Sequence, residues 1–256
     1  MISRYTIWRV FLGSFFIQSA WSFEKMQGLG FASAISPALR EIFKDDEKAG
    51  KDALKRHLVY YNAHPYMASP VIGASMRLEE KVRDKGCAEQ AAPDFKKKVM
   101  GPYGAIGDSF FWNAVRPLAS CIGAAAALLW GMWGPVIFLV VYNSFHFWMR
   151  WYGLKQGYLL GEGVVGYIKG LNLPGWSLRA RYAASAALGV LLASVAADLP
   201  DVAHRAHAVG WAGAGALVIL AAAFLLKFSF KKGISISAVI YAVTLPLILY
   251  GAIFSL

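Results

Sequence analysis

The stretch that decides the fold class is PLASCIGAAAALLWGMWGPVIFLVVYNSFHFWM, residues 117–149, which contains no Asp, Glu, Lys or Arg. An α-helix needs about 20 consecutive apolar residues to cross a bilayer. Two more charge-free runs of that length lie at residues 206–226 and 233–256, and a shorter apolar run covers residues 182–197. A soluble helical core would show polar faces that these runs lack. We therefore predict a protein embedded in a membrane.

Composition and charge support this prediction. Of the 256 residues, 57% are hydrophobic and 16% are charged, whereas an ordinary soluble domain has about 25% charged residues. The net charge is +11, but the cations of the second half stand at the ends of apolar runs, as in cytoplasmic loops that face anionic lipid. We interpret the one basic tract, Lys96-Lys97-Lys98, as a solvated face beside the membrane. Basic and aromatic residues do not interleave, so we expect no nucleic-acid partner.

The two cysteines exclude some kinds of site. Cys87 lies in a polar segment and Cys121 in an apolar one. Two cysteines cannot build a disulfide framework, and neither has neighbours at metal-ligand spacing. We therefore expect no metal and no cofactor.

The chain divides near residue 117 into an N-terminal region, 1–117, and a transmembrane region, 118–256. The second region predicts spans at 118–147 (bent at Gly134-Pro135), 182–198, 209–226 and 234–254. Residues 150–181 carry five Lys or Arg against one acid, so the positive-inside rule places this predicted loop in the cytoplasm. The expected fold is an all-α, multi-pass integral membrane protein that also contains interrupted or re-entrant helical segments.

The N-terminal region predicts two ordinary helices. Residues 3–17 place Trp8, Phe11 and Phe15 on one side of an amphipathic helix, typical of an interfacial element. The pair Asp45-Asp46 is typical of a helix N-terminus, and predicts a charged helix that runs to about Asn62.

The same region also contains apolar segments interrupted by Gly and Pro. We expect a short helix at 26–39 that ends near Pro37, a broken helix or hairpin at 57–76, and a second broken segment at 100–113. Proline removes a backbone donor and interrupts a helix. Paired interrupted segments are the best sequence indication of a transport site in a membrane protein.

Asp108 in the sequence Gly107-Asp108-Ser109 has three interpretations. It could cap a helix that starts at Ser109, contact a polar ligand, or pair loosely with Arg116 two helical turns away. Gly-Asp-Ser is also typical of serine hydrolases, but Phe110 follows it and no strand–turn–helix elbow is visible, which argues against Ser109 as a nucleophile. Glu24 is similarly open between ligand binding and a salt bridge to Lys25 or Arg116.

The amides, carboxylates and large aromatics around these segments form a set typical of carbohydrate sites. Carboxylates and amides bind vicinal hydroxyls, and an aromatic face packs against the C–H surface of a sugar. The alternative for each amide is hydrogen bonding between helices. By contrast, we interpret Glu79-Glu80 as a solvated helix face. The candidate substrate-binding residues are Gln18, Trp21, Glu24, Gln27, Asn62, His64, Asp108, Trp112, Asn113 and Arg116.

Several ordered motifs resemble those of one family, the IID components of the mannose/fructose/sorbose phosphotransferase systems of bacteria. The motifs are Trp21-Ser-Phe-Glu-Lys-Met-Gln27, Asn62-Ala-His-Pro65, Leu78-Glu-Glu80, Met100-Gly-Pro, Gly107-Asp-Ser-Phe-Phe-Trp112 and Val115-Arg-Pro117. The sequence departs from the family pattern at Ser109, where the family has Pro, and at His64, where it usually has Gln.

The resemblance implies a function that composition does not indicate. A IID subunit forms a complex with a IIC subunit in the inner membrane, helps to move a hexose across it, and is expected in a higher-order oligomer of IIC–IID pairs. Soluble IIA and IIB proteins relay phosphate, and IIB phosphorylates the sugar, so His64 is not expected to be a phosphate acceptor. The alternative is a sensory or scaffolding subunit that has kept the fold and lost transport.

Overall fold

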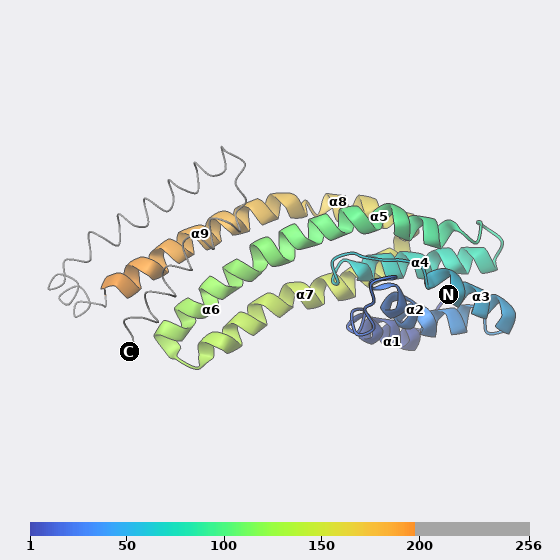
Figure 1. Cartoon of the computed structure of the whole chain (residues 1–256), viewed down its shortest axis with the longest axis horizontal. Helices are drawn as coiled ribbons and strands as arrows, with labels where there is room; N and C mark the ends of the chain where they lie inside the picture. Colours follow the sequence, from blue (N-terminus) through green and yellow to red (C-terminus); the bar gives the residue numbers. More distant parts are fainter. Residues whose placement is uncertain (198–256) are drawn as a thin grey trace, which may run out of the picture. The chain divides into compact units, whose positions relative to one another are not determined.

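The computed structural model describes residues 1–197, and within that range the protein is helical (Figure 1). Two isolated β-bridges, Ser22–Met26 and Met26–Tyr61, are its only extended pairings in the described part. Residues 1–192 form one compact unit. The spans predicted at 209–226 and 234–254 lie outside the described residues, as does the last residue of the span predicted at 182–198.

Three short helices form the N-terminal part: α1 (Arg4–Ser14), α2 (Gly28–Ile42) and α3 (Glu47–His57). The Ser3 side chain caps α1, and the Asp46 side chain caps α3 by accepting a 2.9 Å hydrogen bond from the Ala49 amide. The cap predicted at Asp45-Asp46 is therefore confirmed. Two predicted ends are wrong, because α2 continues through Pro37 to Ile42 and α3 stops at His57 instead of Asn62.

The aromatic face predicted for residues 3–17 packs against another helix of the protein, although Trp8 stays half exposed. The Trp8 and Phe11 rings lie 4.6 and 5.1 Å from Trp151, and Phe15 lies 5.6 Å from Phe147. Both partners belong to α7 (Trp133–Leu160). Helix α1 is therefore held against α7 by its aromatic side, and aromatic pairs at such distances contribute about 0.5–1.5 kcal/mol each beyond their buried area.

The central packing joins α4 (Ala68–Arg83) to α7. A Cβ on Gly73 would lie 2.1 Å from the Leu154 carbonyl oxygen, and one on Gly157 would lie 2.1 Å from the Pro70 carbonyl oxygen. Only glycine lets the two helix backbones approach this closely, as in other membrane helix pairs. The interruption predicted at 57–76 is confirmed, because residues 58–67 are not helical and α4 begins at Ala68.

The break predicted at 100–113 is wrong. Helix α5 (Ala91–Gly107) passes into a π-helical segment, η1 (Asp108–Val115), and then into α6 (Arg116–Trp130) without a gap. Gly107 and Asp108 both have helical backbone angles, so Asp108 does not cap a helix. The only departure from regular α-helix in this stretch is the π-helical segment, and such segments are frequent at functional sites. Residues 91–130 form the one helix of the described part that is long and apolar enough to cross a membrane.

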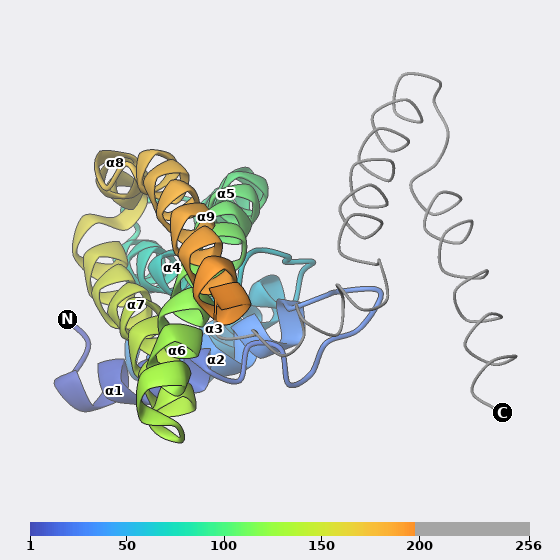
Figure 2. The same cartoon turned by 90° about the vertical axis from the view of Figure 1, so that its left-hand side faces the viewer.

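The predicted bent span at 118–147 is instead a hairpin. Helix α6 ends at Trp130, the chain turns at Gly131, whose φ is +56°, and α7 starts at Trp133. A Cβ on Gly134 would lie 2.4 Å from the Ala127 Cβ, so glycine lets α7 start close against α6. Figures 1 and 2 show α6 and α7 running side by side.

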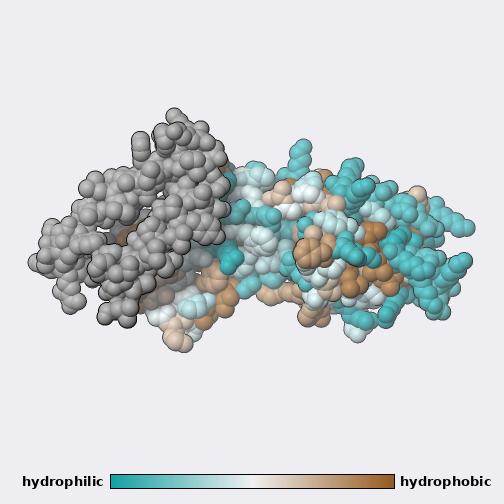
Figure 3. Space-filling model, viewed as in Figure 1, coloured by the Kyte–Doolittle hydropathy of each residue, from teal (hydrophilic) through white to brown (hydrophobic). Residues whose placement is uncertain are grey.

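The predicted cytoplasmic loop at 150–181 is also helical. It contains the end of α7, the one-turn η2 (Gly161–Gly163), α8 (Val164–Gly170) and the start of α9 (Leu173–Ala197). Helix α9 contacts α6 where the Cys121 thiol donates to the Ala184 carbonyl oxygen at 3.6 Å. Hydrophilic side chains gather at the end of the unit where α3 and the turn between α4 and α5 lie (Figures 1 and 3).

Candidate functional site

Residues 59–64 connect two other segments predicted to carry the site, residues 22–28 and 104–112. The Gln27 amide donates to the Tyr61 carbonyl oxygen at 2.8 Å, and the Tyr61 amide donates to the Lys25 carbonyl oxygen at 3.3 Å. The strand-like 59–64 segment then contacts the long helix, where a Cβ on Gly104 would lie 3.8 Å from the Ala63 Cα. The fold therefore brings residues 22–28, 59–64 and 104–112 into one neighbourhood.

Gln27 holds the first two segments together. Its side-chain Nε2 donates to the Ala63 carbonyl oxygen at 2.8 Å, and its Oε1 accepts from the Ala63 amide at 3.2 Å. The side chain is buried, and both of its polar atoms are used by the backbone. Gln27 therefore shapes the site by fixing its loops.

His64 lies at the centre of the neighbourhood, buried against the π-helical segment. Its ring stacks on Phe111 at 4.9 Å and meets Trp112 edge-on at 4.9 Å. Its Nδ1 accepts a 3.3 Å hydrogen bond from the Tyr66 amide, which leaves the proton on Nε2. Nε2 is buried and has no partner among the described residues. A buried donor without a partner is costly, so this atom is a natural contact for a ligand.

Gly107 creates the space that His64 occupies. A Cβ at this position would lie 2.2 Å from the His64 Cβ and 2.9 Å from the Met67 Cγ. Gly107 stands at the last turn of α5, next to the π-helical segment. The sequence identified this glycine as a helix breaker, whereas the structure uses it for close packing.

The remaining candidates differ in exposure. Asp108 is half-buried, and no ion pair joins it to Arg116 or joins Glu24 to a neighbouring cation within residues 1–197. The Trp21 ring packs edge-on against Phe23 at 5.3 Å. The candidates on the surface of the described unit are Gln18, Trp21, Glu24, Asn62, Trp112, Asn113 and Arg116.

Arg150 is a buried cation beside this neighbourhood that the sequence analysis did not single out. Its Nη1 donates to the Ser14 carbonyl oxygen, the last residue of α1, and its Nε donates to His146 Nε2 at 2.6 Å. Its guanidinium lies 4.8 Å from the Phe15 ring and 5.2 Å from the Tyr66 ring. Because cations favour helix C-termini and aromatic faces, Arg150 ties α1 and the His64 loop to α7.

A second buried charged cluster surrounds Glu79, so the predicted solvated face is wrong at this residue. Arg56 donates to both carboxylate oxygens of Glu79, at 2.9 and 2.5 Å, and His57 Nε2 lies 2.9 Å from Oε1. Lys96 is also buried instead of solvated: its Nζ donates to the His57 carbonyl oxygen at 3.1 Å and lies 4.0 Å from the Phe31 ring. A sequence window cannot identify this cluster because its members come from three helices.

The protonation of the cluster follows from its contacts. Burial lowers the pKa of His57, and its Nδ1 is buried with no partner among the described residues. The ring is therefore neutral and donates from Nε2 to Glu79. Burial alone would raise the pKa of the Glu79 carboxyl, but the hydrogen bonds from His57 and Arg56 hold it below its usual value.

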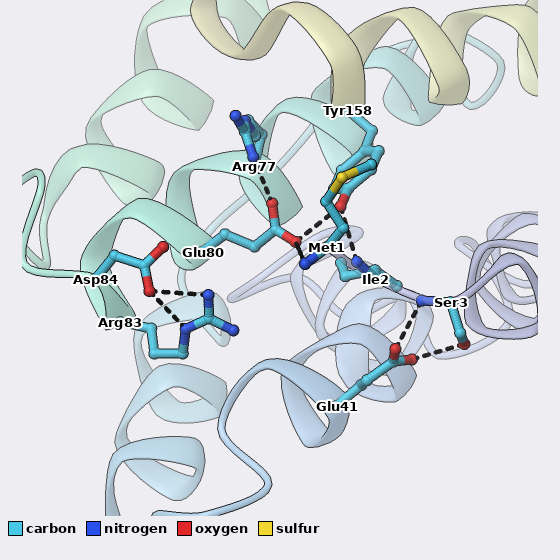
Figure 4. A network of polar contacts seen from close by, with 9 residues as sticks. All are labelled: Met1, Ile2, Ser3, Glu41, Arg77, Glu80, Arg83, Asp84 and Tyr158. Carbon is cyan, nitrogen blue, oxygen red and sulfur yellow. Dashed lines mark hydrogen bonds and ion pairs between the residues drawn. The ribbon is translucent and has the colours of Figure 1, made fainter.

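Glu80, the second acid predicted to be solvated, is buried in the network drawn in Figure 4. Its Oε1 accepts from the Tyr158 hydroxyl at 2.7 Å, and its Oε2 accepts from Arg77 at 2.8 Å. The Tyr158 hydroxyl in turn accepts from the Ile2 amide at 2.9 Å. The start of the chain is thereby bound to α4 and α7.

Neither cluster forms a metal site: no group of His, Cys, Asp or Glu in the described part is arranged to hold a metal ion. Cys87 and Cys121 are both free thiols. The chemistry of the His64 neighbourhood is instead that of hydrogen bonding and aromatic stacking.

Comparison with known proteins identifies relatives across the chain. A family model described as "PTS system mannose/fructose/sorbose family IID component" matches residues 1–253. The mannose-specific EIID component of Escherichia coli K12 is 37% identical over 158 residues, 61% of this chain and 56% of the relative. The fructose permease IID component of Bacillus subtilis is 31% identical over 64% of this chain and 60% of the relative. The alignments thus span little more than half the length of these relatives.

Solved structures agree with the sequence relatives. A chain of the mannose transporter ManYZ in complex with microcin E492 superposes with a TM-score of 0.60 at 32% identity, covering 75% of this chain and 70% of that one. A second solved membrane protein superposes with a TM-score of 0.66 at 33% identity, covering 74% and 70%. The helical fold and these neighbours place the chain among membrane proteins. The chain belongs to the mannose/fructose/sorbose family of IID components of the phosphotransferase system.

Proposed function

We propose that this chain is the IID subunit of a phosphoenolpyruvate-dependent sugar phosphotransferase system, crossing the bacterial inner membrane several times. Together with a IIC subunit it translocates a hexose of the mannose, fructose or sorbose type. IIA and IIB carry the phosphate in the cytoplasm, and IIB phosphorylates the sugar. IIC–IID pairs form a higher-order oligomer. The whole-chain family match and the likeness to the ManYZ transporter support this proposal.

The observation that carries the proposal is the convergence of residues 22–28, 59–64 and 104–112 around His64. In a sugar site, the faces of Trp21 and Trp112 stack on the sugar ring, and the Nε2–H of His64, which has no partner among the described residues, donates to a sugar hydroxyl. The half-buried carboxylate of Asp108 accepts from a hydroxyl. Gln18, Glu24, Asn62, Asn113 and Arg116 supply further polar contacts at the exposed rim, and Gln27 fixes the loops.

The two regions of the chain have different roles in transport. Residues 1–117 carry the substrate contacts, and residues 118–256 supply membrane helices that anchor them. The long helix from Ala91 to Trp130 connects the two, because its first half contacts His64 and its second half is apolar. A movement of this helix would therefore displace the residues that contact His64.

Asp108→Asn is expected to abolish or strongly reduce hexose uptake without disturbing assembly. Asp108 caps no helix and has no ion-pair partner in the described unit, so removing its charge leaves no buried partner unmatched. If the carboxylate contacts the sugar, its removal should weaken sugar binding by about 1–3 kcal/mol. The measurement is radiolabelled sugar uptake in cells that lack their own IID and express the variant with IIC, IIA and IIB.

Asp45→Asn, at an exposed position before α3, is the matched control and should retain uptake. Normal uptake by Asp108→Asn would remove Asp108 from the site. If the unmodified chain copurifies with IIC yet supports uptake of no hexose, the transport proposal fails and a sensory or scaffolding subunit is the correct description.

Gly107→Ala tests the shape of the site. The new methyl group would lie 2.2 Å from the His64 Cβ, so the His64 ring must leave its place on Phe111. We expect a large loss of uptake and a loss of about 1–3 kcal/mol in stability, as for other overpacked positions. Gly101→Ala in the same helix meets nothing within 4 Å and should preserve both. Equal uptake by the two variants would contradict a role for the His64 position.

A further inference from the structure

A groove of about 680 Å³ lies between η1 and α6, α7, and the start of α9, and it adjoins the His64 neighbourhood at Phe110. Its walls are apolar, with Phe110 and Ala119 on one side, Phe145 and Trp148 on the second, and Leu173 and Ala183 on the third. The one hydroxyl in the lining, that of Ser144, donates to the Val140 carbonyl oxygen at 2.7 Å. Apart from the indole N–H groups of Trp148 and Trp176 and the guanidinium of Arg179, the lining side chains offer no free polar group, which suits an alkyl chain.

The one charged side chain in the lining is Arg179, which stands on the α9 wall. Its guanidinium lies 5.1 Å from the Trp176 ring, and no carboxylate of residues 1–197 pairs with it. Arg181 and Lys169 are exposed nearby in the sequence, and the 150–181 segment carries five cations against one acid. Arg179 is exposed and pairs with no acid within residues 1–197, so its guanidinium is available to an anion that is joined to an apolar tail.

We propose that this groove is a binding site for an anionic phospholipid, with one acyl chain between α6, α7 and α9 and the phosphate at Arg179. The positive-inside rule places the 150–181 segment on the cytoplasmic side, where anionic headgroups face the cell interior. Basic pockets between membrane helices on that side are known to bind such headgroups. Trp148 and Trp176 have amphipathic rings suited to the headgroup level.

The dimensions favour a lipid over a protein helix. A helix with its side chains is about 10–12 Å across and rises 5.4 Å per turn, so about 680 Å³ holds only one or two turns. An acyl chain is thinner and flexible. Because the acyl chain moves from the apolar bilayer core into an apolar groove, its burial contributes little binding free energy. The headgroup contact at Arg179 then decides which lipid is retained.

The test uses the full chain copurified with IIC and reconstituted in nanodiscs of equal phosphatidylglycerol and phosphatidylethanolamine. Lipids that remain bound after transfer to detergent are counted by native mass spectrometry. We expect retained phosphatidylglycerol to exceed phosphatidylethanolamine, and Arg179→Gln to lower its retention about fivefold. Arg181→Gln, which removes a neighbouring exposed cation outside the groove lining, should leave it unchanged.

Two further arms distinguish the possible occupants. Ala183→Trp fills the groove and should reduce retention of both lipids, and added inorganic phosphate should not compete. A photo-crosslinker at Ala180 should capture lipid. The proposal is overturned if Arg179→Gln retains phosphatidylglycerol like the unmodified protein, if the two lipids are retained equally, or if the crosslinker captures residues 198–256 or IIC instead.

Discussion

Glu79→Ala is expected to destabilise the protein by about 3–5 kcal/mol, because it leaves the mostly buried guanidinium of Arg56 without its bidentate partner. Lys96, also buried, would lose the Coulombic attraction of the same carboxylate. The measurement is thermal unfolding of the purified protein in detergent, and Tm should fall by several degrees. Glu79→Gln should be intermediate, since it keeps the shape and loses the charge.

Glu47→Ala is the matched control. Glu47 forms a 2.7 Å pair with Lys51 on the surface of α3, and exposed pairs of this kind contribute about 0.3–0.5 kcal/mol. A Glu79→Ala protein as stable as Glu47→Ala would mean that the buried cluster is not a stabilising feature.

The cluster also gives stability a pH dependence with a definite sign. The pKa of His57 is lowered in the folded protein from 6.5, so below about pH 6.5 the unfolded chain binds a proton that the folded one does not. The contribution of His57 to the free energy of unfolding is therefore fully present above that pH and falls as the pH decreases. The lowered pKa of Glu79 adds a loss in the same direction below about pH 4.5. The Glu79→Ala protein should lose this second component.

Gly157→Ala is expected to disrupt the packing of α4 on α7. The added Cβ would lie 2.1 Å from the Pro70 carbonyl oxygen and 2.9 Å from the Ala74 amide nitrogen. Both neighbours are backbone atoms of a helix, so no side-chain rotation relieves the clash and the helices must separate. Overpacking costs about 1–3 kcal/mol in general, and this contact belongs at the upper end. Tm and the yield of folded protein after membrane extraction measure the effect.

Gly166→Ala, in α8, is the control because its Cβ would meet nothing within 4 Å. It should leave Tm unchanged or raise it, since alanine is favoured over glycine in a helix by about 0.5–1 kcal/mol. If both substitutions had the same effect, the close approach of α4 and α7 would not depend on glycine.

Local sequence signals predicted local structure well. The cap at Asp46 and the non-helical stretch before Ala68 are confirmed because each depends on residues close in sequence. The same reasoning failed at Met100–Asn113, where Pro102 and three glycines predicted a break. Gly107 and Phe111 both pack against His64, and the segment that carries them is one continuous helix that is locally π-helical.

The candidate site was predicted in part. Sequence motifs named the segments at 21–27, 62–65 and 107–112, and the fold joins the first two through Gln27, Tyr61 and Ala63. The individual roles were not predictable. Gln27 looks like a ligand-binding amide in the sequence, yet both of its polar atoms are used by the Ala63 backbone. Arg150 reads as a loop cation, yet it is buried between α1 and the Tyr66 ring.

The sequence by itself determined that this is a helical membrane protein of the IID family, because charge-free runs and ordered motifs are properties of the chain alone. Only the tertiary structure decided which charges face water. Glu79, Glu80 and Lys96 look solvated in sequence, but Arg56, Tyr158 and the Phe31 ring reach them from other helices. A buried charge is tolerated only when such partners surround it, and the partners of these three are brought together by folding.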